Sequence, residues 1–256
     1  MIRLSVVLAV YNEEANLKIC LESVKELADE FVVVDGGSQD KTVEIAKKYG
    51  AKIIQTDNPS NFHINKNKAI DVALGDWVLQ LDADEVVTEE LKDEIKQTIS
   101  SKRDYNGYWI KRKNFFLGKF LTKGGQYPDY TLRLYRRGKG RLPAKSVHEQ
   151  AEVSGKVGYL KHPLLHLRDK NFSIYILRFN RYTDILAEEI RDVGVKMNAI
   201  SSVKFLFLKP LVWFLKVYFR HLGFLDGFPG FIFALFSALR FPVAFLKFWM
   251  EERGSK

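Results

Sequence analysis

Cysteine is almost absent from this chain of 256 residues, because Cys20 is the only one. A single thiol excludes an internal disulfide and any zinc site that is built from several cysteines. Two glycine-rich phosphate-binding signatures are also missing: neither Gly-x-x-x-x-Gly-Lys-Ser/Thr nor Gly-x-Gly-x-x-Gly follows the first strand-like run. The sequence therefore indicates neither a P-loop protein nor a dinucleotide-binding protein of the usual kind.

The first residues, Met1 to Ser5, lack the basic region, the apolar region and the small-residue cleavage site of a secretory signal. They lead directly into an apolar run, so we expect a reduced, cytoplasmic location. The apolar fraction of 46% is large enough for a hydrophobic core and excludes an intrinsically disordered chain.

Positive charge is concentrated in the middle of the chain. Residues 1–100 hold 11 basic and 19 acidic side chains, whereas residues 101–149 hold 13 and 3. The net charge of +9 would by itself suggest a nucleic-acid partner, but the basic segment lacks a recognition helix and an aromatic RNA-binding signature. We therefore predict no nucleic-acid partner and expect an anionic glycolipid or a membrane surface instead.

Two hydrophobic periods alternate along the first 85 residues. Short apolar runs rich in β-branched residues predict buried strands, and apolar residues three and four apart predict helices between them. The expected strands cover residues 4–10, 31–34, 52–55 and 77–81, and the expected helices cover 13–27, 41–49 and 65–74. This order predicts an α/β fold with a doubly wound, mainly parallel sheet and helices on both of its faces.

The sequence pattern in the middle of the chain predicts short strands that are separated by Gly and Pro turns and followed by a helix. The expected strands are 108–113, 131–135, 147–153 and 164–167, and the expected helix is 172–191.

Aromatic residues make up nearly a third of residues 203–249. The stretch Gly227 to Leu246 carries one charge, Arg240, and as a straight helix it would be about 30 Å long, the thickness of a bilayer core. Pro229 and Pro242 are expected to interrupt it, and basic residues recur among the aromatics. This pattern favours helices that lie in a membrane interface, or a shallow hairpin, over a clean span. A helical subdomain packed on the rest of the chain, or a dimer interface, is the alternative.

Polar residues follow three of the predicted strands at their carboxyl ends, where ligands bind in open α/β sheets. Asp82 and Asp84 are the sharpest of these signals, because two carboxylates so close together can hold a hard divalent cation whose other ligands are phosphate oxygens and water. With Lys66 they would replace the missing phosphate-binding glycines. A solvated turn is the alternative, since Asp-x-Asp is common by chance.

An ordered set of motifs carries a resemblance to a known family. It consists of Val10-Tyr11-Asn12-Glu13-Glu14, Val33-Val34-Asp35-Gly36-Gly37-Ser38, Lys66-Asn67 and Trp77-Val78-Leu79-Gln80-Leu81-Asp82-Ala83-Asp84-Glu85. Together they resemble family 2 glycosyltransferases of the GT-A fold. Later segments, Gly124-Gly125-Gln126-Tyr127-Pro128-Asp129-Tyr130 and Val147-His148-Glu149, are similar to the branch that contains lipopolysaccharide core β-1,4-glucosyltransferases.

The resemblance implies transfer of a sugar, expected to be glucose, from a UDP-linked donor to a hydroxyl of a lipid-linked or lipopolysaccharide core acceptor. It implies an inverting reaction with Mg²⁺ or Mn²⁺ as cofactor, held by Asp82 and Asp84. The residues expected to bind the nucleotide sugar are Val10, Tyr11, Glu13, Asp35, Lys66, Asn67, Asp82, Ala83 and Asp84. Many relatives have Asp-Asp-Gly-Ser where this chain has Asp35-Gly36-Gly37-Ser38, which leaves the contact to the base less certain than the metal site.

The same resemblance divides the chain into functional parts. Residues 1–100 are expected to form the half of a GT-A domain that binds the nucleotide sugar, and residues 101–170 the half that binds the acceptor. Residues 171–256 are expected to form a helical region that contacts the cytoplasmic face of the inner membrane through residues 203–250. Arg133, Arg136 and His148 are the expected contacts to an anionic acceptor or to phosphate.

An inverting transfer needs a carboxylate that accepts the proton of the attacking hydroxyl. Asp129 and Glu149 are the candidates, and we favour Asp129 because its aromatic neighbours form a setting in which a carboxylate takes up a proton more readily. A strand cap or an ion pair with Arg133 is the structural alternative for Asp129, and a salt bridge within the basic segment is the alternative for Glu149.

Three other interpretations stay open at this point. The histidines His148, His162 and His166 are expected to be structural or to bind a phosphate edge rather than to form a metal site. Transfer to polyprenyl phosphate is an alternative activity that needs no strong base. A non-catalytic module that binds nucleotides or polyanions is the alternative outside the enzymes.

Overall fold

The computed structural model describes residues 4–59, 61–101, 104–143, 150–169 and 171–254. Its contacts divide the chain into two compact units. The first unit is Met1–Lys113 with Asp129–Leu167, and the second is Asn114–Pro128 with Arg168–Lys256. The units interleave along the sequence, because the chain leaves the first unit after Lys113 and returns to it at Asp129.

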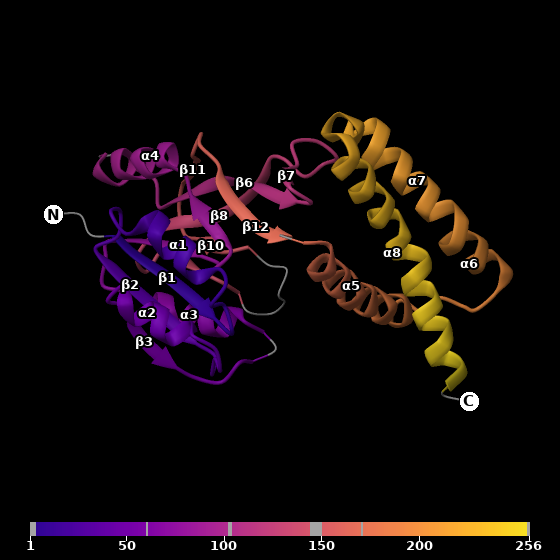
Figure 1. The fold of residues 1–256 in the computed structure, drawn as a ribbon, viewed down its shortest axis with the longest axis horizontal. Coiled ribbons are helices and arrows are strands. Elements are labelled where there is room, and N and C mark those ends of the chain that lie inside the picture. The colour runs from indigo at the N-terminus through magenta and orange to yellow at the C-terminus, as the bar shows by residue number, and fades with distance from the viewer. Residues whose placement is uncertain (1–3, 60, 102–103, 144–149, 170, 255–256) are drawn as a thin grey trace. The chain divides into compact units, whose positions relative to one another are not determined.

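The N-terminal part of the first unit is a parallel sheet with the strand order β3-β2-β1-β4 (Figure 1). Its strands are β1 (Leu4–Val10), β2 (Glu30–Asp35), β3 (Lys52–Gln55) and β4 (Trp77–Leu81). The crossovers contain α1 (Leu17–Val24), α2 (Thr42–Lys48) and α3 (His63–Asp71). β1 and β4 are buried on both faces, as strands between two helical layers must be. The predicted doubly wound sheet is confirmed.

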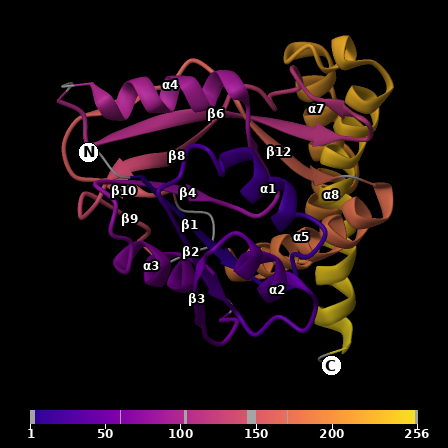
Figure 2. The ribbon, with the colours of Figure 1, turned by 60° about the vertical axis from the view of Figure 1, so that its left-hand side comes forward.

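The sheet then changes from parallel to antiparallel. β8 (Asp129–Arg136) pairs antiparallel with β4, and β6 (Gly107–Phe116) pairs antiparallel with β8 (Figure 2). The other elements are β5 (Glu85–Val87), α4 (Glu89–Ser100), β7 (Lys119–Phe120), β9 (Gly140–Arg141), β10 (Glu152–Val153), β11 (Val157–Tyr159) and β12 (Leu164–Asp169). Of the strand predicted at 147–153, residues 147–149 lie outside the described part of the chain.

β5 and α4 are elements that no sequence pattern predicted. α4 begins at a cap in which the Thr88 hydroxyl accepts a hydrogen bond from Leu91 N, and it buries Leu91 and Ile95. The helix predicted from residue 13 begins only at Leu17. Before it the backbone forms a turn, in which Asn12 adopts a left-handed φ of 53° and Glu13 N donates to the Thr42 hydroxyl.

The second unit is mainly helical. After α5 (Phe172–Asp192), a run of helical segments leads to a turn and then to the long helix α8 (Gly227–Gly254), which packs against α5 and α7 (Figure 1). The segments of the run are α6 (Ala199–Val203), the π-helix Lys204–Leu208, α7 (Lys209–Leu215), the π-helix Lys216–Arg220 and the 3₁₀ helix Gly223–Asp226.

The prediction that Pro229 and Pro242 interrupt the last helix is wrong, because α8 runs through both. Pro229 lies in the first turn, where no backbone N–H donor is needed. Around Pro242, the buried side chains of Phe241, Ala244 and Phe245 hold the helix by tertiary packing.

A buried carboxylate fixes the turn before α8 within the second unit. Asp226 is 2% exposed and accepts hydrogen bonds from Thr122 N, the Thr122 hydroxyl and Lys123 N at 2.7–2.9 Å. Gly124 N donates to His221 O at 2.9 Å. The loop after β7 is therefore fastened to the tip of the helical hairpin that α7 and α8 form.

Candidate active site

The candidate site begins at the turn that follows β4. Asp82 N donates to a carboxylate oxygen of Glu85 at 2.9 Å, and Glu85 N donates to Asp82 O at 3.0 Å. These reciprocal bonds close a tight turn. The strand is buried along its whole length, so the turn carries its carboxylates to the carboxyl edge of the sheet.

Two buried cations pair with Asp82. Lys66, on α3, and Arg133, on β8, each form an ion pair with its carboxylate, and both cationic side chains are 7% exposed. Burial alone would raise the pKa of Asp82, but the Arg133 and Lys66 charges hold it well below its usual range. Burial lowers the pKa of the Lys66 ammonium, and the Asp82 charge opposes this shift. Asp82 is therefore an ionised group whose charge is neutralised by the protein itself.

A chain of ion pairs leads from Asp82 to Asp129. Arg133 also pairs with Glu85 at 2.7 Å, and Glu85, which is fully buried, pairs with Arg112 at 3.4 Å. Arg112 then donates from Nε and Nη2 to Oδ2 of Asp129 at 3.0 and 2.8 Å. Arg112 and Asp129 are direct partners in the register of β6 and β8. The network brings the predicted metal motif and the favoured catalytic carboxylate into one cluster of the first unit.

The partner of Asp129 is Arg112 and not Arg133, the partner considered from the sequence. Arg133 was expected among the acceptor contacts because it belongs to the basic segment. In the structure the Arg133 guanidinium forms ion pairs with Asp82 and Glu85. It also donates a hydrogen bond of 2.6 Å to the Gln80 side-chain oxygen.

Asp84 lies beside a histidine. Its Oδ2 is 3.3 Å from Nε2 of His166, a buried residue on β12, and Leu167 N donates to Asp84 O at 2.8 Å. Ala83, between the two aspartates, is buried. The backbone bond fixes the turn against β12 and holds the imidazole next to the carboxylate.

The residues predicted to bind a nucleotide come from the neighbouring strand ends. Val10, the last residue of β1, is buried, and Tyr11 after it is 43% exposed. Burial raises the pKa of the Glu13 carboxyl, as do the Asp84 and Asp82 charges. Asp35, at the end of β2, is 1% exposed and accepts hydrogen bonds from the backbone N–H groups of Gly37 and Ser38.

Two other predicted residues, Asn67 and Arg136, are placed differently. Asn67 forms two hydrogen bonds with the backbone of Leu142, with Nδ2 donating at 2.9 Å and Oδ1 accepting at 3.1 Å. Arg136 pairs with Trp77 in the sheet register, at the start of β4, and so lies at the opposite end of this strand from Asp82. His148 and Glu149 lie outside the described residues.

No sequence pattern identified Arg112 or Gln80 as a member of the site, and Glu85 was visible only as a polar residue at the end of the fourth predicted strand. His166 was considered from the sequence, but its position beside Asp84 was not. The run Lys111-Arg112-Lys113 was a visible signal in a predicted strand. It did not identify Arg112, because the partner of that residue depends on the register between two antiparallel strands.

The donor chemistry of this edge fits a hard divalent cation. Carboxylate oxygens suit Mg²⁺ and Mn²⁺, and an imidazole nitrogen suits the softer transition metals. Within the described ranges, no three His, Cys, Asp or Glu side chains are already grouped as a metal site.

A mainly parallel sheet that gathers carboxylates and cations at the end of its fourth strand defines an α/β protein of the GT-A type. The solved structure of residues 1–349 of TarS from S. aureus shares this fold, with a TM-score of 0.51 and 19% identity over 91% of this chain and 81% of that chain.

The sequence profile of glycosyl transferase family 2 matches residues 5–149, and the chain belongs to this family. It is similar to the lipopolysaccharide core biosynthesis glycosyltransferase LpsC of Rhizobium meliloti, with 30% identity over 92% of this chain and 88% of LpsC. An uncharacterized glycosyltransferase of Rickettsia typhi is 30% identical over 90% of this chain and 81% of that protein.

The ion pairs of Asp82 predict how stability depends on pH. A carboxylate whose pKa is lowered on folding stabilises the protein above its unfolded pKa of 3.8, and this contribution is lost as the pH falls through the lower folded value. We expect Asp82→Asn to lower the free energy of unfolding by about 3 kcal/mol at pH 7, because it leaves buried cations unpaired. Urea unfolding of the wild type and of Asp82→Asn at pH 7 and at pH 3 measures this loss of free energy of unfolding. The loss should be smaller at pH 3.

Asp71→Asn is the matched control, because Asp71 forms an exposed ion pair with Arg141. It should change the free energy of unfolding by less than about 1 kcal/mol. Equal effects of the two substitutions at pH 7 would contradict the role assigned to Asp82.

Proposed function

We propose that the chain transfers a sugar from a UDP-linked donor, with inversion, to a hydroxyl of a lipid-linked or lipopolysaccharide core acceptor. The observation that carries the proposal is the network of ion pairs that joins Asp82, at the predicted diphosphate site, to Asp129 through Arg133, Glu85 and Arg112. The similarity to LpsC supports the choice of acceptor class, since LpsC is named for lipopolysaccharide core biosynthesis.

In this proposal the nucleotide lies along the edge that Tyr11, Glu13 and Asp35 border. Asp82, Asp84 and His166 would hold Mg²⁺ or Mn²⁺, which when bound neutralises the charge of the departing diphosphate. Lys66 and Arg133 keep Asp82 ionised at this edge. A buried site of fixed charges stabilises a departing anion without reorganising solvent.

The reaction itself is a single displacement. The acceptor hydroxyl oxygen forms a bond to the anomeric carbon as the bond from that carbon to the diphosphate oxygen breaks. Asp129 takes the hydroxyl proton, so the nucleoside diphosphate leaves as the anion. Arg112 orients Asp129 for this step through its two hydrogen bonds to one carboxylate oxygen.

Residues of the second unit are proposed to hold the enzyme at a membrane, on the cytoplasmic face. Among the described helices, one, over Gly223–Arg253, is long and apolar enough to cross a bilayer, and 28% of its most apolar window is buried. Large apolar side chains are also exposed on the preceding helices, among them Phe207 at 66% and Leu211 at 57%. So much exposed apolar surface is typical of an interface with a membrane or a partner.

The base is tested by Asp129→Asn. The amide cannot accept the proton, so transfer to the acceptor should fall by at least about 100-fold. Donor binding, measured as the thermal shift caused by UDP-glucose with Mn²⁺, should persist. Asp104→Asn is the control, since Asp104 is exposed and pairs with Lys156. Retained turnover in Asp129→Asn would assign the role to another carboxylate, with Glu149 the first candidate.

The metal and the donor are tested by Asp84→Asn in a panel of nucleotide sugars. The wild-type chain should release nucleoside diphosphate from one donor, and removal of Mg²⁺ and Mn²⁺ with EDTA should abolish the release. Asp84→Asn should lower the release of nucleoside diphosphate at every metal concentration that saturates the wild type. Full activity in EDTA would exclude the metal, and no release from any donor would favour a non-catalytic binding module.

Attachment to a membrane is tested by charging the exposed apolar face of the helices. Phe207→Glu combined with Leu211→Glu should reduce sedimentation of the chain with phospholipid vesicles, because each buried charge opposes insertion. The control places two glutamates at Ile19 and Leu74, which are exposed apolar residues of the first unit. Equal sedimentation of the charged variant and the wild type would contradict the proposed attachment.

A further inference from the structure

The helices of the second unit carry an open, apolar groove with a volume of about 890 Å³. Its lining includes Ile200, Val203, Val212, Trp213 and Phe241. Two of these side chains are largely exposed, Ile200 at 79% and Val212 at 62%. The volume matches that of small-molecule sites, and the apolar lining suits a hydrocarbon chain.

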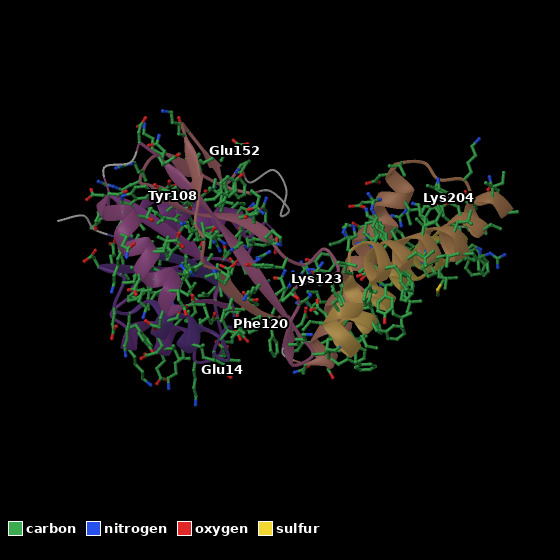
Figure 3. The ribbon with its side chains drawn as sticks, turned by 90° about the horizontal axis from the view of Figure 1, so that it is seen from above. Glu14, Tyr108, Phe120, Lys123, Glu152 and Lys204 are labelled. Carbon is green, nitrogen blue, oxygen red and sulfur yellow. The ribbon has the colours of Figure 1, made fainter. Side chains whose placement is uncertain are left out.

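Two lysines, Lys204 and Lys209, stand on this otherwise apolar lining. Lys204 opens a π-helix, and Lys209 N donates to Lys204 O across it. The wider π turn places both lysines on one side of the helix, and π-helical turns are frequent at functional sites. Figure 3 shows Lys204 on the helices of this unit. Burial and repulsion from Lys204 lower the pKa of the Lys209 ammonium.

Aromatic rings lie close to two cations of this unit, Lys209 and Arg240. Lys209 Nζ is 3.8 Å from the ring centroid of Phe205 and 5.5 Å from that of Phe241. The guanidinium carbon of Arg240 is 4.5 Å from the ring centroid of Trp213 and 4.8 Å from that of Phe241. Such cation–π contacts orient a positive charge without neutralising it.

Acidic side chains are nearly absent from this region. Asp226 is the only Asp or Glu between residues 193 and 250, and its carboxylate is buried in hydrogen bonds with Thr122 and Lys123. None of the ion pairs formed by the described residues includes Lys204 or Lys209. The groove therefore combines an apolar lining with two lysines that take no part in the ion pairs of the described residues.

We propose that this groove binds one anionic phospholipid, with an acyl chain along the apolar lining and the phosphate between Lys204 and Lys209. The inference rests on the proposed attachment to a membrane and makes it specific for lipid charge. An inorganic anion alone would leave the apolar lining uncovered. A second copy of the chain docked symmetrically on this face would bring like charges together.

The test measures how much phospholipid the full chain retains in detergent micelles, by native mass spectrometry. The probes are phosphatidylglycerol, which is anionic, and phosphatidylcholine, which is zwitterionic. The wild type should retain one phosphatidylglycerol and little phosphatidylcholine. Lys204→Gln combined with Lys209→Gln should weaken this retention about 25-fold, since each lysine near an anionic lipid contributes about fivefold.

The matched control is Lys196→Gln combined with Arg220→Gln. It removes the same charge from exposed positions of the same region that do not line the groove. Retention of phosphatidylglycerol should stay within about twofold of the wild type, as expected when the contacts of the groove are intact. Val212→Trp fills the groove and should also abolish retention, whereas Leu215→Trp, on an exposed residue outside the lining, should not.

Equal retention of the two lipids, or equal losses in the two double variants, would overturn the site. Sedimentation with phosphatidylglycerol vesicles tests the membrane attachment separately from the lipid site. A wild-type chain that retains the lipid in micelles but does not sediment would support the site and contradict the attachment. If Lys204→Gln combined with Lys209→Gln no longer retains phosphatidylglycerol but still sediments, both the lipid site and the membrane attachment would be supported.

Discussion

The pairing of Asp82 with Lys66 and Arg133 is the interaction on which the first unit depends. Strand β4 carries Asp82 to the edge of the sheet, helix α3 supplies the lysine, and the antiparallel strand β8 supplies the arginine. Three elements from distant parts of the sequence are thus fixed by one carboxylate. A buried ion of this kind is costly unless its partners are present, so the pairing specifies which elements must meet.

The same pairing connects structure with chemistry. Arg133 contacts Asp82 and Glu85 together, and Glu85 contacts Arg112, so the alternating charges extend to Asp129. A displacement at an anomeric carbon needs stabilisation of the leaving diphosphate at one end and a proton acceptor at the other. In the proposed function the divalent cation that Asp82 and Asp84 would hold serves the first end and Asp129 serves the second. The arginines between Asp82 and Asp129 set the separation of these two carboxylates. Neither carboxylate can move without breaking an ion pair.

Much of this arrangement could be predicted from local sequence patterns. The strands 52–55 and 77–81 have the predicted bounds, because short apolar runs between amphipathic helices are strong signals. The Asp82 and Asp84 motif was visible for the same reason, since it follows such a run. Helix α4 was missed although its apolar residues Leu91 and Ile95 are spaced for burial, because the charged residues around them obscured the pattern.

The partners inside the site could not be predicted in this way. Arg133 lies 51 residues from Asp82 and meets it only because β8 pairs with β4. The contact between Arg112 and Asp129 depends on the register of β6 and β8, which no local pattern determines. In the second unit, packing of Ala244 and Phe245 keeps α8 helical through Pro242, which overrides the local preference of proline.

The central claim is a single displacement in which Asp129 takes the proton while the diphosphate leaves at the Asp82 edge. The anomeric configuration of the first product, determined by ¹H NMR with a UDP-α-sugar donor, tests it most directly. The account predicts a β-linked product. An α-linked product would contradict it, because a single displacement inverts the configuration of the anomeric carbon.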